Sequence, residues 1–590
     1  MVVLDRLPLG SSGKLDRRAL PAPVWAARAT GHVEPRTETE KALAAIWAEV
    51  LGVERIGVED NYFALGGDSI LSIQIVSAAR RAGIELTPRH LFVHQTVADL
   101  AAAAREVPAT AAEAERGPVV GEVPLTPIQH WLFDQLGAAA GHFTQSVSAE
   151  LTAPVDESAL RTALSTVLTH HDALRLRFER TEDGAVRQHN APPDAEPVLD
   201  LHDLSAVAPE RRDAVMRETA GRIRAGFDLA RGPLLRAVLF TRGEGIRPVL
   251  LLTAHHLVVD AVSWRIVLED LDTAYRQIVA GRTPEPGPKT TSFRTWALRL
   301  TEHTAAGGFD AERDYWAASH GGTDLPTDGE GPNTAASEEE VTVRLDAEET
   351  RLLLHEVPGA YRTRVNDVLL CALGRVLARW TGRDTVAVAL EGHGREEIFD
   401  GVDLSRTVGW FTSMFPVALE APADWGLERT LRAVKERLRA VPGNGLGHGA
   451  LRHLSGAAAS GLPAASKISF NYLGQQDWEP PAGGLLHALT GGLEGDMSPE
   501  APRPHLLDVI GRVTDRRLEL SWSYSRSLHQ RPTVRRSPRR WPRSCGRSSG
   551  CAPARTRAGG HRRTSRWPGL TRRPSTGWRA TAGMWPISIR

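Results

Sequence analysis

Two adjacent histidines and an aspartate follow an apolar run in the middle of the chain. Residues 249–254 are apolar apart from one threonine, His255 and His256 come next, and Asp260 precedes a stretch with helical spacing. Side chains at the carboxyl end of a buried strand face a crevice, and an imidazole there exchanges protons near neutral pH. Asp260 is expected to orient a ring or to form an internal salt bridge. On spacing alone a structural role is the commoner outcome for these residues. No metal is expected, because no further ligand at suitable spacing accompanies the two histidines and the aspartate.

A serine stands where a loop is expected to become a helix. In the segment NYFALGGDSI, residues 61–70, two glycines precede Ser69 and apolar residues recur after it with helical spacing. The glycines allow a tight turn, and the N-terminus of a helix stabilises an anionic phosphate. Ser69 is therefore placed to carry a phosphodiester, and its alternative role is that of a simple helix N-cap.

The elements that would position these residues fall into a small unit and a large one. Residues 36–105 read as helices, the first opened by a capping box of Thr37 and Glu40, and residues 106–121 read as a linker rich in Ala, Glu, Pro and Gly. Beyond them helices alternate with strand-like runs, a pattern typical of α/β layers. The strand-like runs include 173–178, 234–240, 249–253, 385–390, 408–417 and 468–473.

The small unit resembles the carrier (thiolation) domain of nonribosomal peptide synthetases. The segment LGGDS is similar to the site where that domain receives 4′-phosphopantetheine. The resemblance covers residues 36–105 and implies a small all-α four-helix carrier domain with the cofactor on Ser69, flanked by Gly67 and Asp68. Asp68 is the variant typical of carriers that feed an epimerization domain. Upstream, GKLDRRALP resembles the last motif of an adenylation domain, so residues 1–30 are interpreted as its C-terminal remnant, in which Lys14 has no catalytic work.

The large unit resembles the condensation and epimerization superfamily of the same synthetases. The pattern HHxxxDxxSW at 255–264 is joined, in family order, by PLTPIQ at 124–129, EGHGRE at 391–396, TVGWFT at 407–412 and FNYLG at 470–474. The resemblance spans residues 122–534 and implies a two-lobed α/β domain of the chloramphenicol-acetyltransferase type. Ala261, where condensation members usually have glycine, favours an epimerization domain. His448 stands at a position usually held by tyrosine.

The resemblance implies that His256 and Glu391 exchange the Cα proton of an aminoacyl thioester on opposite faces. Either of them could serve the face that carries the proton of the L isomer. For this cycle Glu391 must be partly desolvated, so that its pKa rises toward neutrality. Without the resemblance, Glu391 would be interpreted as a loop carboxylate paired with Arg395.

Supporting roles are expected for the neighbours of these two residues. His255 is expected to be a hydrogen-bonded structural partner rather than a base, and Asp260 a supporting group. Asn471 and Tyr472 either line the pocket and donate hydrogen bonds or form a half-buried strand pair. Trp264 is expected in the core, and Cys371 as a packed thiol.

The favoured function is L-to-D epimerization of an aminoacyl or peptidyl thioester in nonribosomal peptide biosynthesis. The implied partners are a phosphopantetheinyl transferase, an upstream adenylation domain, a downstream condensation domain and the thioester substrate. The alternatives are condensation-type peptide-bond formation and a non-catalytic, carrier-only remnant. The amino acid carried and the final natural product are not defined by the sequence.

The tail differs from the rest of the chain. Residues 531–590 hold 16 Arg and no Lys, Asp or Glu, whereas residues 1–530 carry a net charge of −16. The tail shows no helical or strand period, and we expect residues 535–590 to be disordered. An out-of-frame translation explains its composition better than a nucleic-acid-binding arm does. The helix expected to close the large domain is then lost, which would leave that domain unstable or inactive.

Composition excludes several other classes of protein. No stretch approaches 18 consecutive apolar residues, so no membrane span is expected, and the N-terminus lacks the pattern of a secretory signal. Three cysteines among 590 residues exclude a disulfide scaffold and a cysteine-rich metal site. A cytoplasmic location is expected.

Overall fold

The computed structural model describes most of the chain outside its two ends. The described residues are 33–63, 65–67, 69–106, 117–152, 154–193, 198–319, 325–456, 462, 466–475, 483–490, 495–539 and 588–589. The expectations for residues 1–30, for Lys14 and for Asp68 therefore lie outside the described residues.

The small unit is a four-helix domain, as the sequence predicts. Its helices are α1 (Glu38–Leu51), α2 (Ser69–Arg81), α3 (Pro88–Val93) and α4 (Val97–Ala103). The predicted capping box is present, because the Thr37 side chain accepts from the Glu40 N–H at 3.1 Å and the Glu40 carboxylate accepts from the Thr37 N–H at 3.0 Å. The apolar stripe of α1 is buried in a core of its own, where the rings of Trp47 and Tyr62 lie 5.3 Å apart.

The first lobe of the large domain is built on a five-stranded sheet. Its order is β14 (Leu486–Leu489), β4 (Thr144–Leu151), β9 (Val249–His255), β8 (Leu235–Thr241) and β7 (Leu199–Asp203). All seven residues of β9 are buried, because alternate residues face opposite sides of the sheet and both sides are covered. Leu250 and Leu252 join the main core with α6 (Glu157–His170) and α8 (Ala261–Val279), and Leu251 packs on the side of α7 (Pro209–Ala225).

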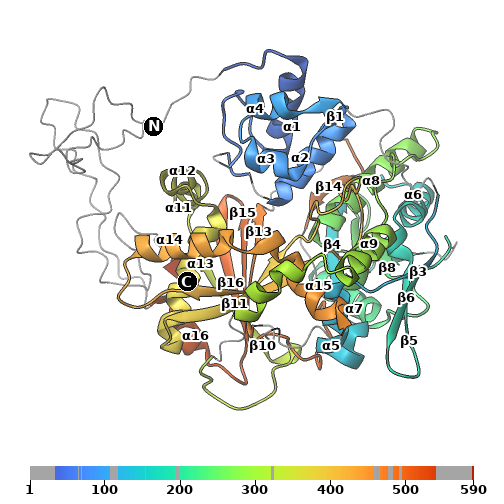
Figure 1. Ribbon diagram of the computed structural model, residues 1–590. Helices are drawn as coiled ribbons and strands as arrows, with labels where there is room; N and C mark the ends of the chain where they lie inside the picture. Colours follow the sequence, from blue (N-terminus) through green and yellow to red (C-terminus); the bar gives the residue numbers. More distant parts are fainter. Residues whose placement is uncertain are drawn as a thin grey trace, which may run out of the picture.

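The second lobe is built on a seven-stranded mixed sheet. Its order is β12 (Ser413–Glu420), β11 (Thr385–Gly392), β13 (Ile468–Gln475), β15 (Leu507–Thr514), β16 (Arg517–Ser525), β10 (Glu338–Arg344) and β17 (Ser588–Ile589). Strands β11, β13 and β15 are parallel neighbours, and the other pairs are antiparallel. Helices α13 (Val365–Thr381) and α14 (Leu427–Arg439) pack beside β11 and β12 (Figure 1).

The two lobes share one hydrophobic core. Strand β14 comes from the C-terminal half of the chain, yet it pairs with β4 and so completes the sheet of the first lobe. A single cluster of buried residues includes Leu252 from the first lobe and Phe470 from the second. The expected two-lobed α/β fold is confirmed. No described helix combines the length and the apolar character needed to cross a bilayer.

Two predicted strands begin later than the sequence pattern indicated. Residues 172–175 form a 3₁₀ turn, and the strand β5 is Leu176–Arg180 rather than 173–178. Likewise β12 starts at Ser413 rather than at residue 408. In the second case tertiary contacts decide the outcome, because the backbone of Gly409 is held by the Ser263 hydroxyl instead of by a neighbouring strand.

A short helix follows the last long strand, although the sequence suggested that the closing helix is lost. Helix α16 is Arg531–Arg539; it packs against α13, and Val534 is fully buried. The two-residue strand β17 pairs with β10. Residues 540–587, on which the expectation of a disordered tail mainly rests, lie outside the described part of the chain.

Candidate active site

His256 stands at the end of β9, as the sequence predicts. The chain leaves β9 through a short 3₁₀ turn, His256–Val258, and enters α8 at Ala261. Asp260 is the N-cap of α8 and accepts from the Ser263 N–H at 2.7 Å. Strand, turn and capped helix together fix the imidazole at the edge of the first-lobe sheet.

Hydrogen bonds define which nitrogen of His256 is basic. Nδ1 lies 2.9 Å from the Val259 carbonyl oxygen, which can only accept, so Nδ1 donates. Nε2 lies 2.8 Å from the Gln145 amide nitrogen, and the Gln145 oxygen accepts from the Trp264 indole at 3.0 Å. The indole therefore orients the amide, and the amide donates to Nε2. Burial lowers the pKa of His256 below its ordinary value, which favours a neutral imidazole that carries its proton on Nδ1 and accepts at Nε2.

Two aromatic rings pack against the imidazole and against each other, since the Phe143 and Trp410 centroids are 6.0 Å apart. Phe143 stacks on His256 with ring centroids 5.2 Å apart, and Trp410 lies 4.3 Å away. Sequence reasoning assigned no role to Phe143, Gln145 or Trp410. Two of these residues have features that could have drawn attention to them. Gln145 is a polar residue on the partly buried strand β4, and Trp410 belongs to the TVGWFT motif. Neither feature predicts contact with His256.

Asp260 forms the internal salt bridge that was one of its two expected roles. Both carboxylate oxygens lie 3.0 Å from Arg395, which is buried, and the same carboxylate also accepts from Ser263. Arg395 also donates to the carbonyl oxygens of Leu404 and Thr407. The alternative pairing of Arg395 with Glu391 is therefore wrong. This ion pair ties the first lobe to the segment that follows β11.

Glu391 is the seventh residue of β11 and stands opposite Met414, near the start of the antiparallel strand β12. Asn471 on β13 donates to its carboxylate at 2.7 Å. The carboxylate keeps surface accessible to water, but the surrounding protein removes much of its solvation and raises the pKa of Glu391 to about 7. His505 opposes this shift and Asp508 adds to it. Because side chains alternate along β13, Tyr472 points to the face opposite Asn471 and packs partly buried against the core.

The two candidate acid–base groups stand on different sheets. Among the described contacts, no hydrogen bond or ring contact joins Glu391 to His256 directly. The chain after β11 makes the connection, because Arg395 binds Asp260 and Trp410 covers His256. One segment, residues 393–412, therefore follows β11 directly and also contacts the residues that follow β9.

The neighbouring residues have structural contacts. His255 is fully buried, its Nε2 lies 2.7 Å from the Ala140 carbonyl oxygen, and burial lowers its pKa to about 3. Cys371 is a buried thiol whose pKa burial raises to about 12. Of the described residues, His170, His171 and Asp270 also lie close enough to hold a cation, but Arg406 already neutralises the Asp270 carboxylate.

The carrier domain lies against the large domain. In Figure 1 the blue carrier helices lie beside both lobes, and α2 and α3 are on the side of the carrier that faces the large domain. Arg80 at the end of α2 forms an ion pair with Asp403, Arg81 lies 3.8 Å from Glu269, and the Arg364 guanidinium covers the Phe92 ring at 4.9 Å.

The loop that leads to Ser69 lies at this interface. A Cβ on Gly66 would lie 2.8 Å from the Gln475 amide nitrogen on β13. A Cβ on Gly67 would lie 2.4 Å from the Tyr62 ring, so glycine is required there. The tight glycine turn followed by the start of α2 at Ser69 fits a phosphopantetheine attachment site, because the N-terminus of a helix stabilises an anionic phosphate.

Comparisons with known proteins agree with this arrangement. The condensation-domain model matches residues 119–544, and the model of the phosphopantetheine attachment site matches residues 41–104. A linear gramicidin synthase of Brevibacillus parabrevis is 46% identical over 545 residues, which are 90% of this chain and 10% of that protein. The chain therefore spans about a tenth of the length of that curated relative.

Two solved structures are also similar. The epimerization domain from the third module of tyrocidine synthetase B is 34% identical, with a TM-score of 0.66 over 72% of this chain and 97% of that one. The first condensation domain of the calcium-dependent antibiotic synthetase shares the fold, with a TM-score of 0.54 at 21% identity over 71% of this chain and 95% of that one. The chain belongs to the condensation-domain family of nonribosomal peptide synthetases and carries a phosphopantetheine-binding domain ahead of its condensation-type domain.

Proposed function

We propose that this protein carries an aminoacyl or peptidyl thioester on Ser69 and epimerizes its Cα from L to D. The observation that supports the proposal is the placement of two acid–base groups at the ends of β9 and β11. His256 is a partly buried imidazole whose Nε2 is an acceptor and whose pKa burial lowers, and Glu391 is a solvent-exposed carboxyl group whose pKa the surrounding protein raises to about 7. One base and one acid are thus available at the same pH, as a two-base proton exchange requires.

The proposed reaction breaks and remakes one bond. The phosphopantetheine arm, when attached, presents the substrate as a thioester, whose carbonyl acidifies the Cα proton. One of the two groups takes that proton, and the electron pair of the C–H bond moves into the enolate. The other group returns a proton to the opposite face. The reaction is redox-neutral and reaches the same equilibrium from either isomer.

Three neighbours have positioning roles in this proposal. Gln145 and Trp264 keep Nε2 of His256 as the acceptor, and Asn471 holds the Glu391 carboxylate. Asp260 acts through Arg395 on the shape of the loop rather than on the proton. A phosphopantetheinyl transferase would modify Ser69, and adenylation and condensation domains would supply and consume the thioester. The similarity to an epimerization domain over nearly its whole length supports this function.

Condensation-type peptide-bond formation is the second candidate. It is favoured by the match to the condensation family as a whole, since the histidine motif is shared across that superfamily. In this case a nucleophilic amine on a second carrier would attack the thioester, and no Cα proton would exchange.

Deuterium uptake at Cα separates the two functions. Ser69 of the full chain is loaded with an L-aminoacyl-phosphopantetheine, incubated in D₂O, and the released thioester is analysed for mass and chirality. We expect deuterium together with the D isomer, and loss of both in His256→Ala and Glu391→Gln. Glu396→Gln is the matched control, because it changes a carboxylate in the same motif whose contacts are Asn444 and His393.

Efficient loading without deuterium uptake would overturn the epimerization proposal. Peptide formation with an added aminoacyl carrier in the same sample would then establish condensation. Uptake that survives in both variants would show that other residues move the proton.

A further inference from the structure

One face of the second-lobe sheet carries Glu391 together with a cluster of polar side chains. Asn471 on β13 points to this face, since it donates to the Glu391 carboxylate at 2.7 Å. Ser469 lies two residues before Asn471 on the same strand and therefore points to the same face. Asp508 on β15 is opposite Ser469 in the ladder, and it accepts from the Ser469 hydroxyl at 2.6 Å. Four side chains from three neighbouring strands thus share one face.

The two oxygens of the Asp508 carboxylate have different partners. Oδ1 accepts from Ser469 and lies 2.9 Å from Nδ1 of His505, whereas Oδ2 accepts from Arg503 at 2.6 Å. His505 is therefore bound to the oxygen that faces β13, the strand that holds Glu391. Loss of solvation acts to raise the pKa of Asp508, but the hydrogen bond from His505 and the charges of His505 and Arg503 outweigh it and lower the pKa. Asp508 is thus a carboxylate near neutral pH.

The imidazole of His505 is held from several sides. His505 is buried and comes two residues before β15. The ring of Trp131, on helix α5 (Pro127–Leu136), is stacked on it with centroids 6.4 Å apart, and the His505 carbonyl oxygen accepts from the Asn333 amide at 2.8 Å. Together with the bond to Asp508, these contacts fix the imidazole next to the face that carries the cluster.

The Asp508 and Glu391 carboxylates are close enough to influence each other's charge. The side chains that bind them, Ser469 and Asn471, are about 7 Å apart, because a strand rises about 3.3 Å per residue. The two carboxylates are therefore about 10 Å apart, one strand further across the sheet. At about 10 Å two unit charges change each other's pKa by roughly 0.3 in water and by about 1 at the effective dielectric constant of a protein.

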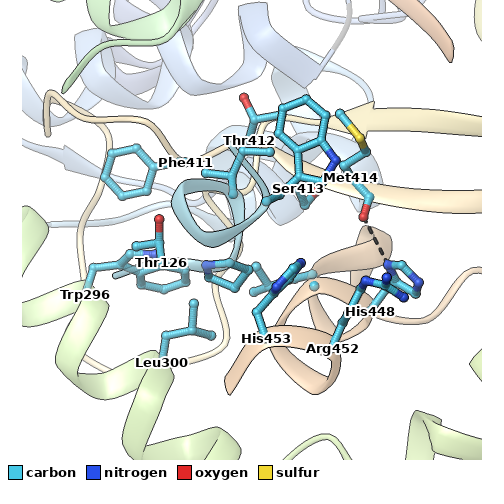
Figure 2. A pocket seen from close by; sticks show the side chains of 15 residues that line it. Thr126, Trp296, Leu300, Phe411, Thr412, Ser413, Met414, His448, Arg452 and His453 are labelled. Atoms are coloured by element: carbon cyan, nitrogen blue, oxygen red, sulfur yellow. Dashed lines mark hydrogen bonds between the residues drawn. The ribbon is translucent and has the colours of Figure 1, made fainter. Parts of the chain in front are cut away.

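The neighbours of Glu391 on its other side are uncharged or paired elsewhere. Met414 stands opposite Glu391 in the β11–β12 ladder. It also lines a small pocket with Ser413 and His448, and its carbonyl oxygen accepts from Nδ1 of His448 (Figure 2). Burial lowers the pKa of His448 to about 4, so this imidazole is neutral near pH 7. Arg395, four residues after Glu391, is paired with a carboxylate of the first lobe.

We propose that Asp508 and His505 are positioning residues for the proton exchange, and that their charges decide, in opposite senses, whether Glu391 holds a proton. The Asp508 carboxylate repels a negative charge on Glu391 and favours the protonated acid, whereas protonated His505 stabilises the Glu391 carboxylate. The pKa of Glu391 supports this assignment, because loss of solvation raises it most, His505 opposes the rise and Asp508 adds to it. The inference rests on the proposed function, in which Glu391 is one of the two acid–base groups.

The test is the pH dependence of Cα deuterium uptake into the same L-aminoacyl-phosphopantetheine on Ser69 of the full chain. Uptake falls at high pH when Glu391 loses its proton, so the alkaline limb of the profile reports that ionisation. We expect Asp508→Asn to move this limb to lower pH by roughly half a pH unit, and His505→Gln to move it to higher pH by a similar amount. A purely structural defect would lower the rate at every pH and leave the limb in place.

Two controls separate charge from structure. Asp508→Glu keeps the negative charge, and its alkaline limb should match that of the unchanged protein. Glu420→Gln makes the same change from carboxylate to amide on the same sheet, but at the far end of β12, about 20 Å away, and should also leave the limb in place. His505→Gln keeps the ion pair of Asp508 with Arg503, so it tests the proposal by itself if Asp508→Asn does not fold.

Infrared spectroscopy reports the ionisation of Glu391 without the reaction. The carboxyl C=O band that disappears in Glu391→Gln is followed against pH in each variant of the full chain. A midpoint that falls in Asp508→Asn and rises in His505→Gln, with no deuterium uptake in any sample, would support the role of the two charges and overturn the epimerization proposal. Uptake with a limb and a midpoint that neither variant moves would overturn this role and leave epimerization intact. Movement of the limb in the same direction in both variants would overturn it as well.

Discussion

The protonation states of two side chains set the chemistry available at the level of single residues. The ordinary pKa of a glutamate is 4.5 and that of a histidine is 6.5, so in water the carboxylate loses its proton first. In this fold loss of solvation moves both values, since it disfavours the charged form of each group. The pKa of Glu391 rises to about 7 and that of His256 falls below 6.5, so the usual order is reversed.

This reversed order predicts a bell-shaped pH profile for Cα deuterium uptake. Below the pKa of His256 both groups hold a proton and no base is present. Above about pH 7 both have lost it and no acid is present, because Glu391 ionises there. The maximum is therefore expected between the lowered pKa of His256 and about pH 7. The test is the initial rate of deuterium uptake measured from about pH 5 to about pH 9, which is roughly the range in which such groups titrate. A rate that keeps rising above about pH 8, which is about one pH unit above the pKa of Glu391, would contradict the prediction.

At the level of elements, helix α2 begins at Ser69, the proposed attachment residue, and meets the large domain at its other end. Arg80 and Arg81 lie in its last turn, next to Asp403 and Glu269 of the large domain. Ile73, on the same helix, belongs to the main core cluster of the large domain. Helix α2 thus sets the distance between Ser69, where we propose that the phosphopantetheine arm is attached, and the contacts of Arg80 and Arg81 with the large domain.

Charge reversal at this contact should affect only substrates that the carrier delivers. We expect Arg80→Glu to slow uptake into Ser69-bound thioester several-fold, because a like-charge contact with Asp403 weakens docking by about 1–2 kcal/mol. The rate with a soluble N-acetylcysteamine thioester should not change. Asp403→Arg in the same chain should restore the carrier-bound rate. Lys41→Glu, the same charge change on the exposed surface of α1, is the control, and an equal loss in that variant would argue against a specific contact.

The start of β12 is a feature of the fold that the sequence pattern predicts incorrectly. The alternation of residues 408–417 predicted one strand, but only its second half joins the sheet as β12. The first half is drawn away by Ser263 and Asp260, which bind the backbone at Gly409 and Phe411. Local periodicity contains no information on hydrogen bonds formed with residues about 150 positions away.

For the whole molecule, the carrier and the large domain each have a main core, and Ile73 of α2 joins the core cluster of the large domain. The carrier core is closed around Leu43, Trp47, Leu91 and Leu100, all fully buried. The large domain has one main core that runs through both lobes. The contacts between the two units are ion pairs and a cation–π contact, which contribute little to stability at a surface, together with the buried side chain of Ile73.

Truncating the carrier core should therefore destabilise one unit only. Leu100→Ala removes a fully buried side chain, and we expect it to lower the free energy of unfolding of the carrier by about 2–5 kcal/mol. Hydrogen exchange should accelerate in α1, whereas α13 of the large domain keeps its protection. An equal loss of protection in both helices would show that the two units unfold together.

The sequence by itself determined the division into carrier and condensation-type domain, the capped first helix, the buried strand ending at the histidines and the identity of His256, Glu391 and Ser69 as candidates. The capped helix and the buried strand follow from local spacing, capping and apolar periodicity, whereas the condensation-type domain and the three candidate residues follow from the resemblance of short motifs to a known family. The tertiary structure decided that Arg395 pairs with Asp260, that Gln145 and Trp410 hold His256, and that Ser413 and His448 share one small pocket. The first three contacts join positions more than a hundred residues apart, and Ser413 and His448 come from different elements, so only the packing of the whole chain determines them.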